Sequence, residues 1–311
     1  MKAYFLKEAG PVENLQLQET PIPELKAGEV LVKVKAISIN PVDYKARGND
    51  GVLSWIYQDV RPIILGWDIS GVVEKVDEGT NFQVGDEVFG MVNFIGFGNA
   101  YAEYVAAPAS HLALKPANIS FEEAAGATLA ALTALQGINT AGVKAGAKAL
   151  VHGASGGVGH YAAQLLVNLG ADVYGTSSSN SKDFVESLGV KHIDYSAQRF
   201  EDVATDFDFV FNTVPGETFI RSIDAAKPGG SILSIINPSE EIQAKAAAKD
   251  VNLEYILVAS NGEDMKTLAD LMAAGKVKTN VEEVFSFENL PQAHTRAAAG
   301  NVKGKIIVTL S

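Results

Sequence analysis

The chain has 311 residues, with 37 acidic and 25 basic side chains, a formal net charge of −12 and no cysteine. The lack of cysteine excludes disulfides, thiolate zinc sites, iron–sulfur clusters and a cysteine nucleophile. The acidic balance argues against binding to nucleic acid phosphates or anionic membrane, which needs clustered Lys and Arg. No apolar run approaches the roughly 18 residues of a membrane span, and the N-terminus is charged too early for a secretory signal, so we expect a cytoplasmic protein.

Residues 1–120 are predicted to form a β-rich domain of strands and loops. The segment Glu29–Ile39 alternates apolar and polar residues and is rich in β-branched side chains, which indicates a half-buried strand. Shorter strands are expected at residues 71–76 and 86–90, with glycine-containing turns between them.

From residue 121 the pattern changes, and residues 121–261 are predicted to form a second domain. Ser120 is placed to cap a helix over residues 121–140, with two acidic residues in its first turn. Strands and helices then alternate, which predicts a parallel sheet covered on both faces, that is, a doubly wound α/β fold. The strands are expected at residues 148–152, 172–176, 192–195, 207–211, 231–236 and 251–258. The helices are expected at roughly 160–169, 181–188, 216–226 and 239–248.

The remaining segment, residues 262–311, departs from this regular alternation. A helix is expected near residues 263–274, a strand at 281–285, an alanine-rich helix near 289–299 and a last strand at 305–310. We expect this segment to rejoin the N-terminal domain at least in part.

A glycine-rich segment follows the predicted strand at residues 148–152 and leads into a helix. Small residues let the backbone approach a pyrophosphate, while the free N–H groups and the dipole of the helix favour its negative charge. This context predicts a dinucleotide-binding loop, although a merely tight strand–helix turn is the alternative. The loop residues are Gly153, Ala154, Ser155, Gly156, Gly157, Val158 and Gly159.

The end of the following strand bears on which dinucleotide is bound. Enzymes that use NAD place an acidic residue there, on the ribose 2′-hydroxyl. Here the segment contains Ser177, Ser178 and Lys182, with no acid before Asp183. Hydroxyls and an ammonium suit a 2′-phosphate, with Tyr195 a possible neighbour of the adenine, so we expect NADPH. The alternative is that the serines simply cap the next helix.

Taken over its whole length, the chain resembles the medium-chain dehydrogenase/reductase superfamily, in its zinc-independent quinone oxidoreductase-like branch. The resemblance implies a GroES-like substrate domain, a Rossmann domain, a cleft between them, a small-molecule substrate and a homodimer. The segments that carry it, besides the glycine loop, are Asn40-Pro41-Val42-Asp43-Tyr44-Lys45, Gly66-Trp67-Asp68-Ile69-Ser70-Gly71-Val72-Val73, Val84-Gly85-Asp86-Glu87-Val88, Gly98-Asn99-Ala100-Tyr101-Ala102-Glu103-Tyr104 and Gly304-Lys305-Ile306-Ile307-Val308.

The chain departs from the zinc-dependent members of this superfamily at two places. They carry a cysteine near the position of Asn40, and Gly-His-Glu where this chain has Gly66-Trp67-Asp68. The five histidines are scattered without the spacing of metal ligands and are read as structural. We therefore expect no metal site.

The resemblance implies candidate catalytic residues and one further cofactor-binding residue, Thr133. It implies that Asn40 lies near the nicotinamide and the substrate, and that Thr133 lies on the nicotinamide side. Tyr44 and Lys45 are candidates for polar or proton-donating groups. The alternatives are a turn residue before a proline for Asn40, a helix-face hydroxyl for Thr133, and surface or packing roles for Tyr44 and Lys45.

Aromatic residues bear on the acceptor. Trp67, Phe94 and Phe97 are candidates to line a flat apolar pocket, with core packing as the alternative for each. Without zinc to stabilise an alkoxide, suitable substrates spread the incoming negative charge themselves. We therefore expect an NADPH-dependent enzyme that transfers hydride to quinones. Reduction of the C=C bond of enals or enones is the alternative, and a low-turnover NADPH-binding redox sensor is a second one.

Overall fold

The computed structural model describes all 311 residues, and they form two compact units. The first unit combines Met1–Leu132 with Ala259–Ser311, and the second is Thr133–Val258. The first unit extends past residue 120 because helix α3 (Phe121–Gly126) packs on strands of that unit. None of the helices in the chain combines the length and apolar character that crossing a bilayer requires.

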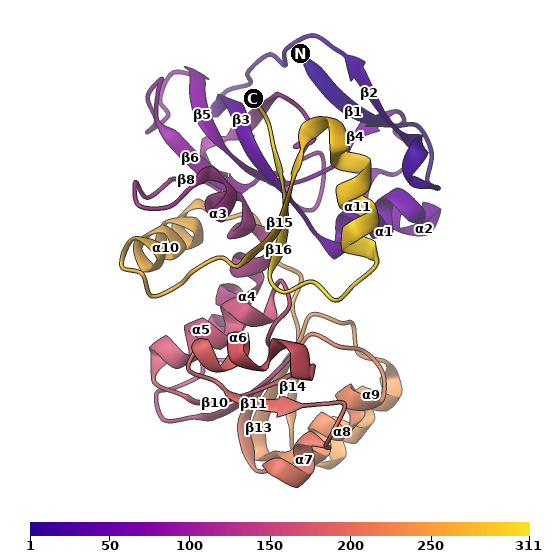
Figure 1. The fold of residues 1–311 in the computed structure, drawn as a ribbon, viewed down its shortest axis with the longest axis vertical. Coiled ribbons are helices and arrows are strands. Elements are labelled where there is room, and N and C mark those ends of the chain that lie inside the picture. Colours follow the sequence, from indigo (N-terminus) through magenta and orange to yellow (C-terminus); the bar gives the residue numbers. More distant parts are fainter. The chain divides into compact units, whose positions relative to one another are not determined.

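The first unit is built on a seven-stranded sheet with the order β15-β16-β3-β5-β6-β8, and β7 also pairs with β3. The C-terminal strand β16, drawn in yellow, lies antiparallel beside the indigo β3, with Ile306 opposite Ile39 (Figure 1). The segment after residue 261 thus supplies strands to the sheet of the N-terminal segment. The seven strands are β3 (Glu29–Ile39), β5 (Asp68–Val76), β6 (Glu87–Met91), β7 (Tyr104–Pro108), β8 (Leu112–Leu114), β15 (Val281–Ser286) and β16 (Lys305–Thr309).

A smaller antiparallel sheet and several helices complete this unit. The sheet has the order β2-β1-β4, from β1 (Lys2–Leu6), β2 (Leu15–Glu19) and β4 (Ile63–Ile64). The helices of the C-terminal segment are α10 (Gly262–Ala273) and α11 (Leu290–Ala298). Three short 3₁₀ helices lie at Val12–Asn14, Ala109–His111 and Phe287–Asn289.

The prediction of strands and loops alone for residues 1–120 was wrong at one place. Two consecutive helices, α1 (Pro41–Gly48) and α2 (Asp50–Tyr57), fill the connection between β3 and β4. Each has only eight residues, which is too short for a clear helical period. The local start signals were present, since a proline occupies the first turn of α1 and the Asn49 side chain accepts a hydrogen bond from Val52 N at the start of α2.

The single helix predicted over residues 121–140 is also corrected, because the structure has two. Helix α3 ends at Gly126 and α4 (Leu129–Thr140) begins three residues later. The Asp68 carboxylate accepts a hydrogen bond from Leu129 N at 3.0 Å. An acidic side chain from a distant strand therefore caps α4, and no local sequence pattern encodes that contact.

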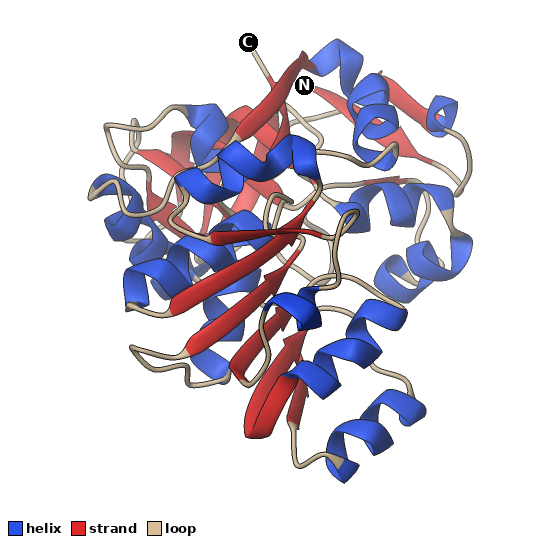
Figure 2. Ribbon diagram, turned by 60° about the horizontal axis from the view of Figure 1, so that its bottom comes forward, coloured by secondary structure: helices blue, strands red, loops and turns tan.

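The second unit is a parallel sheet with helices on both sides, as Figure 2 shows. The strand order is β11-β10-β9-β12-β13-β14, which is the 3-2-1-4-5-6 order of a Rossmann fold. The strands are β9 (Lys148–His152), β10 (Asp172–Ser177), β11 (Lys191–Asp194), β12 (Phe207–Asn212), β13 (Ala226–Ser234) and β14 (Asn252–Tyr255). The helices are α5 (Gly159–Leu169), α6 (Lys182–Ser187), α7 (Phe200–Val203), α8 (Glu217–Ala225) and α9 (Glu240–Ala248), with a 3₁₀ turn at Ser179–Ser181.

Buried apolar side chains of β9, β11, β12 and β13 form a continuous core with helices α7, α8 and α9. Leu150, Val210 and Ile232 are completely buried within it. Because the paired strands are parallel, their carboxyl ends lie along one edge of the sheet. The prediction of a doubly wound α/β domain is confirmed, with the last two strands shifted or shortened at their ends.

Candidate active site

The glycine loop lies between the end of β9 and the start of α5. Gly153 has φ +66°, a left-handed conformation that a side chain rarely adopts. The loop is tied to the end of β10 because Ala154 N donates to Thr176 O at 2.9 Å, and it turns back on itself because Gly156 N donates to Gly153 O at 2.9 Å. Helix α5 begins without a side-chain cap. Backbone oxygens of the loop accept from its first turn instead, since His160 N donates to Gly156 O and Tyr161 N donates to Val158 O, both at 3.1 Å.

Two close approaches explain why the loop contains so little side-chain volume. A Cβ atom added at Gly159 would lie 2.1 Å from Gly153 O. A Cβ atom added to Gly175 of β10 would lie 2.6 Å from the Ala154 side chain. Glycine is therefore required where helix, strand and loop converge, and the loop residues from Ser155 to Val158 stay partly exposed. This backbone cradle fits the pyrophosphate of a dinucleotide.

The structure places the predicted 2′-phosphate residues at the same edge of the sheet as the loop. Ser177 ends β10, and Tyr195 N donates to Ser177 O at 3.2 Å. The Ser177 hydroxyl is buried and hydrogen-bonds with His192 Nε2 at 2.9 Å, a partner that the sequence did not indicate. Ser178 is half-buried, and Lys182 is exposed with its ammonium 3.9 Å from Glu186. Ser178 and Lys182 therefore stay available to an anion.

The first unit holds a buried polar cluster that we call the aspartate–lysine cluster, made of Asn40, Asp43, Asp68 and Lys305. Asn40 Nδ2 donates to Asp68 Oδ2 at 2.7 Å, and the Lys305 ammonium donates to Asn40 Oδ1 and lies 4.0 Å from Asp68 Oδ2. Asn40 N donates to Asp43 Oδ2 at 2.6 Å. All four side chains are almost completely buried, and they come from β5, β16 and the start of α1.

Burial and mutual charge shift the titration of this cluster. Burial, and next the charge of Asp68, raise the pKa of Asp43 to about 7. Burial also raises the pKa of Asp68, against the lowering effect of Lys305 and of hydrogen bonds from Asn40, Thr128 and Leu129. Burial lowers the pKa of Lys305, while both aspartates oppose that shift.

The three candidate catalytic residues lie in the first unit, and the candidate nicotinamide contact Thr133 lies in the second. Asn40 precedes α1 and is 1% exposed, with both ends of its amide hydrogen-bonded inside the aspartate–lysine cluster. Tyr44 lies half-buried on α1, and burial together with the charge of Asp43 raises its pKa. Lys45 is exposed on the same helix. Thr133 is buried in α4 and belongs to the second unit.

The aromatic residues gather in one cluster of the first unit. The rings of Trp67 and Phe94 pack edge to face at 5.2 Å between centroids, and Tyr57 packs against both Trp67 and Phe97. Trp67 is completely buried, and its indole N–H donates to Gly96 O at 2.8 Å. It therefore supports the loop that carries Phe94 and Phe97, whereas Phe97 is 43% exposed. The surface that can meet a flat acceptor belongs to the loop aromatics.

The donor set does not fit a zinc ion. At the two positions where zinc-dependent relatives have ligands, an amide donates to Asp68 and an indole donates to a carbonyl. The buried cation at this place is the Lys305 ammonium. No group of three or more His, Cys, Asp or Glu side chains is arranged to hold a metal ion.

One completely buried histidine of the second unit has a structural environment. His152 hydrogen-bonds with the hydroxyls of Thr176 and Ser222, and burial lowers its pKa to about 3. Its imidazole is therefore neutral at physiological pH and its two nitrogens are satisfied.

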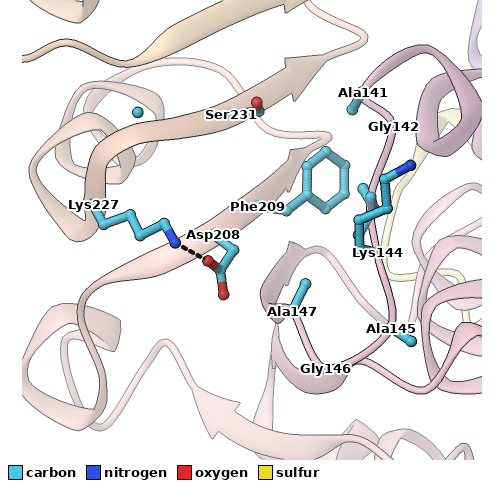
Figure 3. A pocket seen from close by; sticks show the side chains of 12 residues that line it. Ala141, Gly142, Lys144, Ala145, Gly146, Ala147, Asp208, Phe209, Lys227 and Ser231 are labelled. Atoms are coloured by element: carbon cyan, nitrogen blue, oxygen red, sulfur yellow. Dashed lines mark ion pairs between the residues drawn. The ribbon is translucent and has the colours of Figure 1, made fainter.

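A pocket of about 390 Å³ opens at the opposite edge of the parallel sheet, where the strands begin (Figure 3). Ala147 precedes β9 there, and the Lys227 side chain reaches across to form an ion pair with Asp208. Asp208 also accepts a hydrogen bond from Lys148 N at 2.7 Å. Because ligands of such sheets bind at the carboxyl ends of the strands, this pocket is separate from the glycine-loop site, and its carboxylate is already paired.

Comparison with known proteins agrees with this architecture. Residues 26–117 match the family model described as alcohol dehydrogenase GroES-like domain, and residues 188–308 match the one described as zinc-binding dehydrogenase. The chain is 33% identical to 2-methylene-furan-3-one reductase of Solanum lycopersicum, over 99% of this chain and 79% of the relative. It is 32% identical to the chloroplastic NADPH-dependent alkenal/one oxidoreductase of Arabidopsis thaliana, over 99% of this chain and 79% of that protein.

A solved structure extends the likeness to the whole fold. The quinone oxidoreductase from Coxiella burnetii superposes with a TM-score of 0.91 at 33% identity, covering 100% of this chain and 99% of that chain. The Rossmann sheet, the GroES-like unit and these full-length relatives lead to one conclusion. The chain is an oxidoreductase and belongs to the medium-chain dehydrogenase/reductase superfamily, in its quinone oxidoreductase-like branch.

Proposed function

We propose that the chain is an NADPH-dependent, zinc-independent oxidoreductase that transfers hydride to quinones. The observation that carries the proposal concerns the two positions at which zinc-dependent relatives have zinc ligands. Asn40 and Trp67 occupy them here, and the buried cation at this place is the Lys305 ammonium. Without a metal to stabilise an alkoxide, the acceptor has to delocalise the charge that it receives. Quinones do so as a phenolate.

Reduction of the C=C bond of enals or enones is the second candidate, because these acceptors delocalise the same charge as an enolate. Two relatives at similar identity are named as reductases of such conjugated carbonyls, and the solved relative is named a quinone oxidoreductase. Both acceptor classes are flat, and both suit the partly exposed aromatic surface at Phe97.

The preference for NADPH rests on the end of β10. Ser178 and Lys182 stand where an NAD enzyme has an acidic residue, so a 2′-phosphate would meet a hydroxyl and an ammonium there. The backbone of the glycine loop would hold the pyrophosphate. When bound, the dinucleotide supplies the hydride.

In the reaction, the chain itself binds and orients the dinucleotide and the acceptor, and it supplies a proton. The acceptor gains two electrons with the hydride and must also take up one proton. The Tyr44 hydroxyl is the candidate donor, because it lies half-buried on α1 and a phenol carries its proton at neutral pH. Burial raises its pKa, so the transfer has to follow the arrival of the negative charge on the acceptor oxygen. Lys45 is the other candidate on the same helix, with an exposed ammonium.

One assay tests the function. Purified protein is mixed with NADPH and either a quinone or an enal or enone, in the presence and absence of a chelator. We expect oxidation of NADPH in both conditions at the same rate. Loss of turnover with the chelator contradicts a zinc-independent reaction, and tight NADPH binding without oxidation by either acceptor class favours a redox sensor instead.

We also propose a cytoplasmic homodimer. Strand β14 is an unpaired edge of the parallel sheet, and Tyr255 and Leu257 beside it are each 45% exposed. An exposed apolar edge strand is suited to pairing with a second copy. Light scattering should therefore give twice the monomer mass, and Tyr255→Lys should lower it to that of the monomer.

A further inference from the structure

The aspartate–lysine cluster contains two carboxyl groups and one ammonium, all removed from water. Lys305 is 3% exposed, Asp68 is 1% exposed and Asp43 is completely buried. One buried cation balances one buried carboxylate, and a second unpaired negative charge in the same low-dielectric site is costly. One of the two aspartates must therefore hold a proton.

The hydrogen bonds show which one it is. Asp68 is arranged as a carboxylate, because its oxygens accept from Asn40 Nδ2 at 2.7 Å and from Leu129 N at 3.0 Å, and Lys305 lies 4.0 Å away. Asp43 accepts one hydrogen bond, from Asn40 N to Oδ2. Its other oxygen, Oδ1, is buried without a hydrogen-bond partner.

Two tyrosine hydroxyls, those of Tyr57 and Tyr101, interact electrostatically with Asp43. The Tyr57 hydroxyl is buried and also lacks a partner. The Tyr101 hydroxyl lowers the pKa of Asp43, but burial and the charge of Asp68 outweigh this effect, and Tyr101 also hydrogen-bonds with His294 Nε2 at 2.8 Å. A protonated Oδ1 could donate to a hydroxyl such as that of Tyr57, whereas a carboxylate adds a second negative charge to a site with one ammonium.

We propose that Asp43 is a positioning residue that holds a proton on Oδ1 and, in that form, keeps the start of helix α1, and with it Tyr44, in the geometry that turnover requires. The proposal rests on the proposed function, since Tyr44 is the candidate proton donor there. Asn40 connects the other three side chains of the cluster. Its backbone N–H donates to Asp43, and its side-chain amide donates to Asp68 and accepts from Lys305.

The charged and titratable groups around Asp43 come from every element packed on it. They are Asp68 on β5, Lys305 on β16, Tyr57 on α2, Tyr101 in the segment before β7, and Tyr44 on α1. Tyr101 in turn interacts electrostatically with Arg47 and hydrogen-bonds with His294. Of these groups only Lys305 carries a positive charge next to the two aspartates, and it is already shared with Asp68 and Asn40.

Loss of the proton therefore brings a second negative charge against Asp68. Water entering the cluster or a movement of the start of α1 reduces the repulsion between the two carboxylates. Tyr44 moves with that helix. Turnover should then fall as pH rises through the titration of Asp43, to roughly one tenth at pH 8 relative to pH 6.

The test compares three proteins: wild type, Asp43→Asn, and the matched control Asp59→Asn on an exposed loop. Asparagine imitates the neutral acid, so the D43N variant should keep the low-pH rate and lack the alkaline loss that wild type and D59N share. Difference infrared spectroscopy provides a second measurement. The carbonyl band of a protonated carboxyl should titrate near pH 7 in wild type and D59N and be absent in D43N.

The outcomes separate this inference from the proposed function. An alkaline profile identical in D43N and D59N, or the lack of a band that D43N removes, overturns the role of Asp43 while NADPH oxidation itself stands. A wild type that oxidises NADPH with neither acceptor class overturns the proposed function. In that case the infrared comparison of wild type with D43N still decides whether Asp43 holds the proton. If D43N does not fold, a wild type without any carboxyl band that titrates near pH 7 overturns the inference.

Discussion

Replacement of Asp43 by asparagine should make the first unit more stable, and by an amount that grows with pH. The pKa of Asp43 is raised from 3.8 to about 7 in the folded chain. Below pH 3.8 both states hold the proton and the shift costs nothing. Between the two values the unfolded chain has released its proton while the folded chain keeps it, so folding becomes less favourable as pH rises.

The magnitude follows from the same shift. At 1.36 kcal/mol per pKa unit, a rise from 3.8 to about 7 costs wild type about 4 kcal/mol above pH 7, and about 3 kcal/mol of this appears between pH 5 and pH 8. The D43N variant lacks this titration. Its free energy of unfolding should therefore exceed that of wild type by about 3 kcal/mol more at pH 8 than at pH 5.

The chain offers a selective probe for this measurement. Its two tryptophans, Trp55 and Trp67, both belong to the first unit, so intrinsic fluorescence during urea unfolding reports on the unit that contains Asp43. D59N is the control and should follow wild type at every pH. A difference between D43N and wild type that stays constant from pH 5 to pH 8 would refute the assignment of the proton to Asp43.

Three further predictions concern the cofactor and acceptor sites. Lys182→Ala should weaken NADPH binding by about tenfold, the loss of one charge-assisted contact, while NADH binding in a fluorescence titration stays unchanged. Gly159→Ala should abolish NADPH binding, because its Cβ would lie 2.1 Å from Gly153 O. Gly48→Ala is the control, because no atom lies within 4 Å of the Cβ position there. Equal NADPH binding by both variants would contradict the assignment of the glycine loop as the dinucleotide site. Phe97→Ala should raise KM for quinones about tenfold and Phe97→Leu much less, since about 1.4 kcal/mol of ring contact is lost.

The fold could be predicted where the same short sequence pattern, an apolar strand followed by a helix, repeats along the chain. Each strand of the parallel sheet is an apolar run followed by a helix, so the six strands of the second unit could be located, and the glycine loop followed from its place after β9. Helices α1 and α2 were not predicted because eight residues are too few to show a helical period. The break between α3 and α4 depends on Asp68, which lies 61 positions before its partner Leu129.

The aspartate–lysine cluster was missed for a related reason. Asp43, Asp68 and Lys305 lie in three of the segments that carry the family resemblance, so the residues themselves could be seen in the sequence. A charged residue inside a short motif is usually exposed, and nothing local reveals that these three converge. Asn40 was singled out as a catalytic candidate, but a sequence cannot show that both ends of its amide are bonded within the chain.

The position of Lys305 shows how the chain connects the segments in which zinc-dependent relatives carry ligands. A buried ammonium is expensive to desolvate, and it is retained only where its hydrogen bonds and counter-charge are complete. Here β16 brings the ammonium to the end of β3, where Asn40 accepts its hydrogen bond and Asp68 supplies the counter-charge. A fixed cation of the protein thus organises β3, β5 and β16. Because one ammonium cannot balance two carboxylates, the same arrangement is the physical basis of the proton that we propose for Asp43.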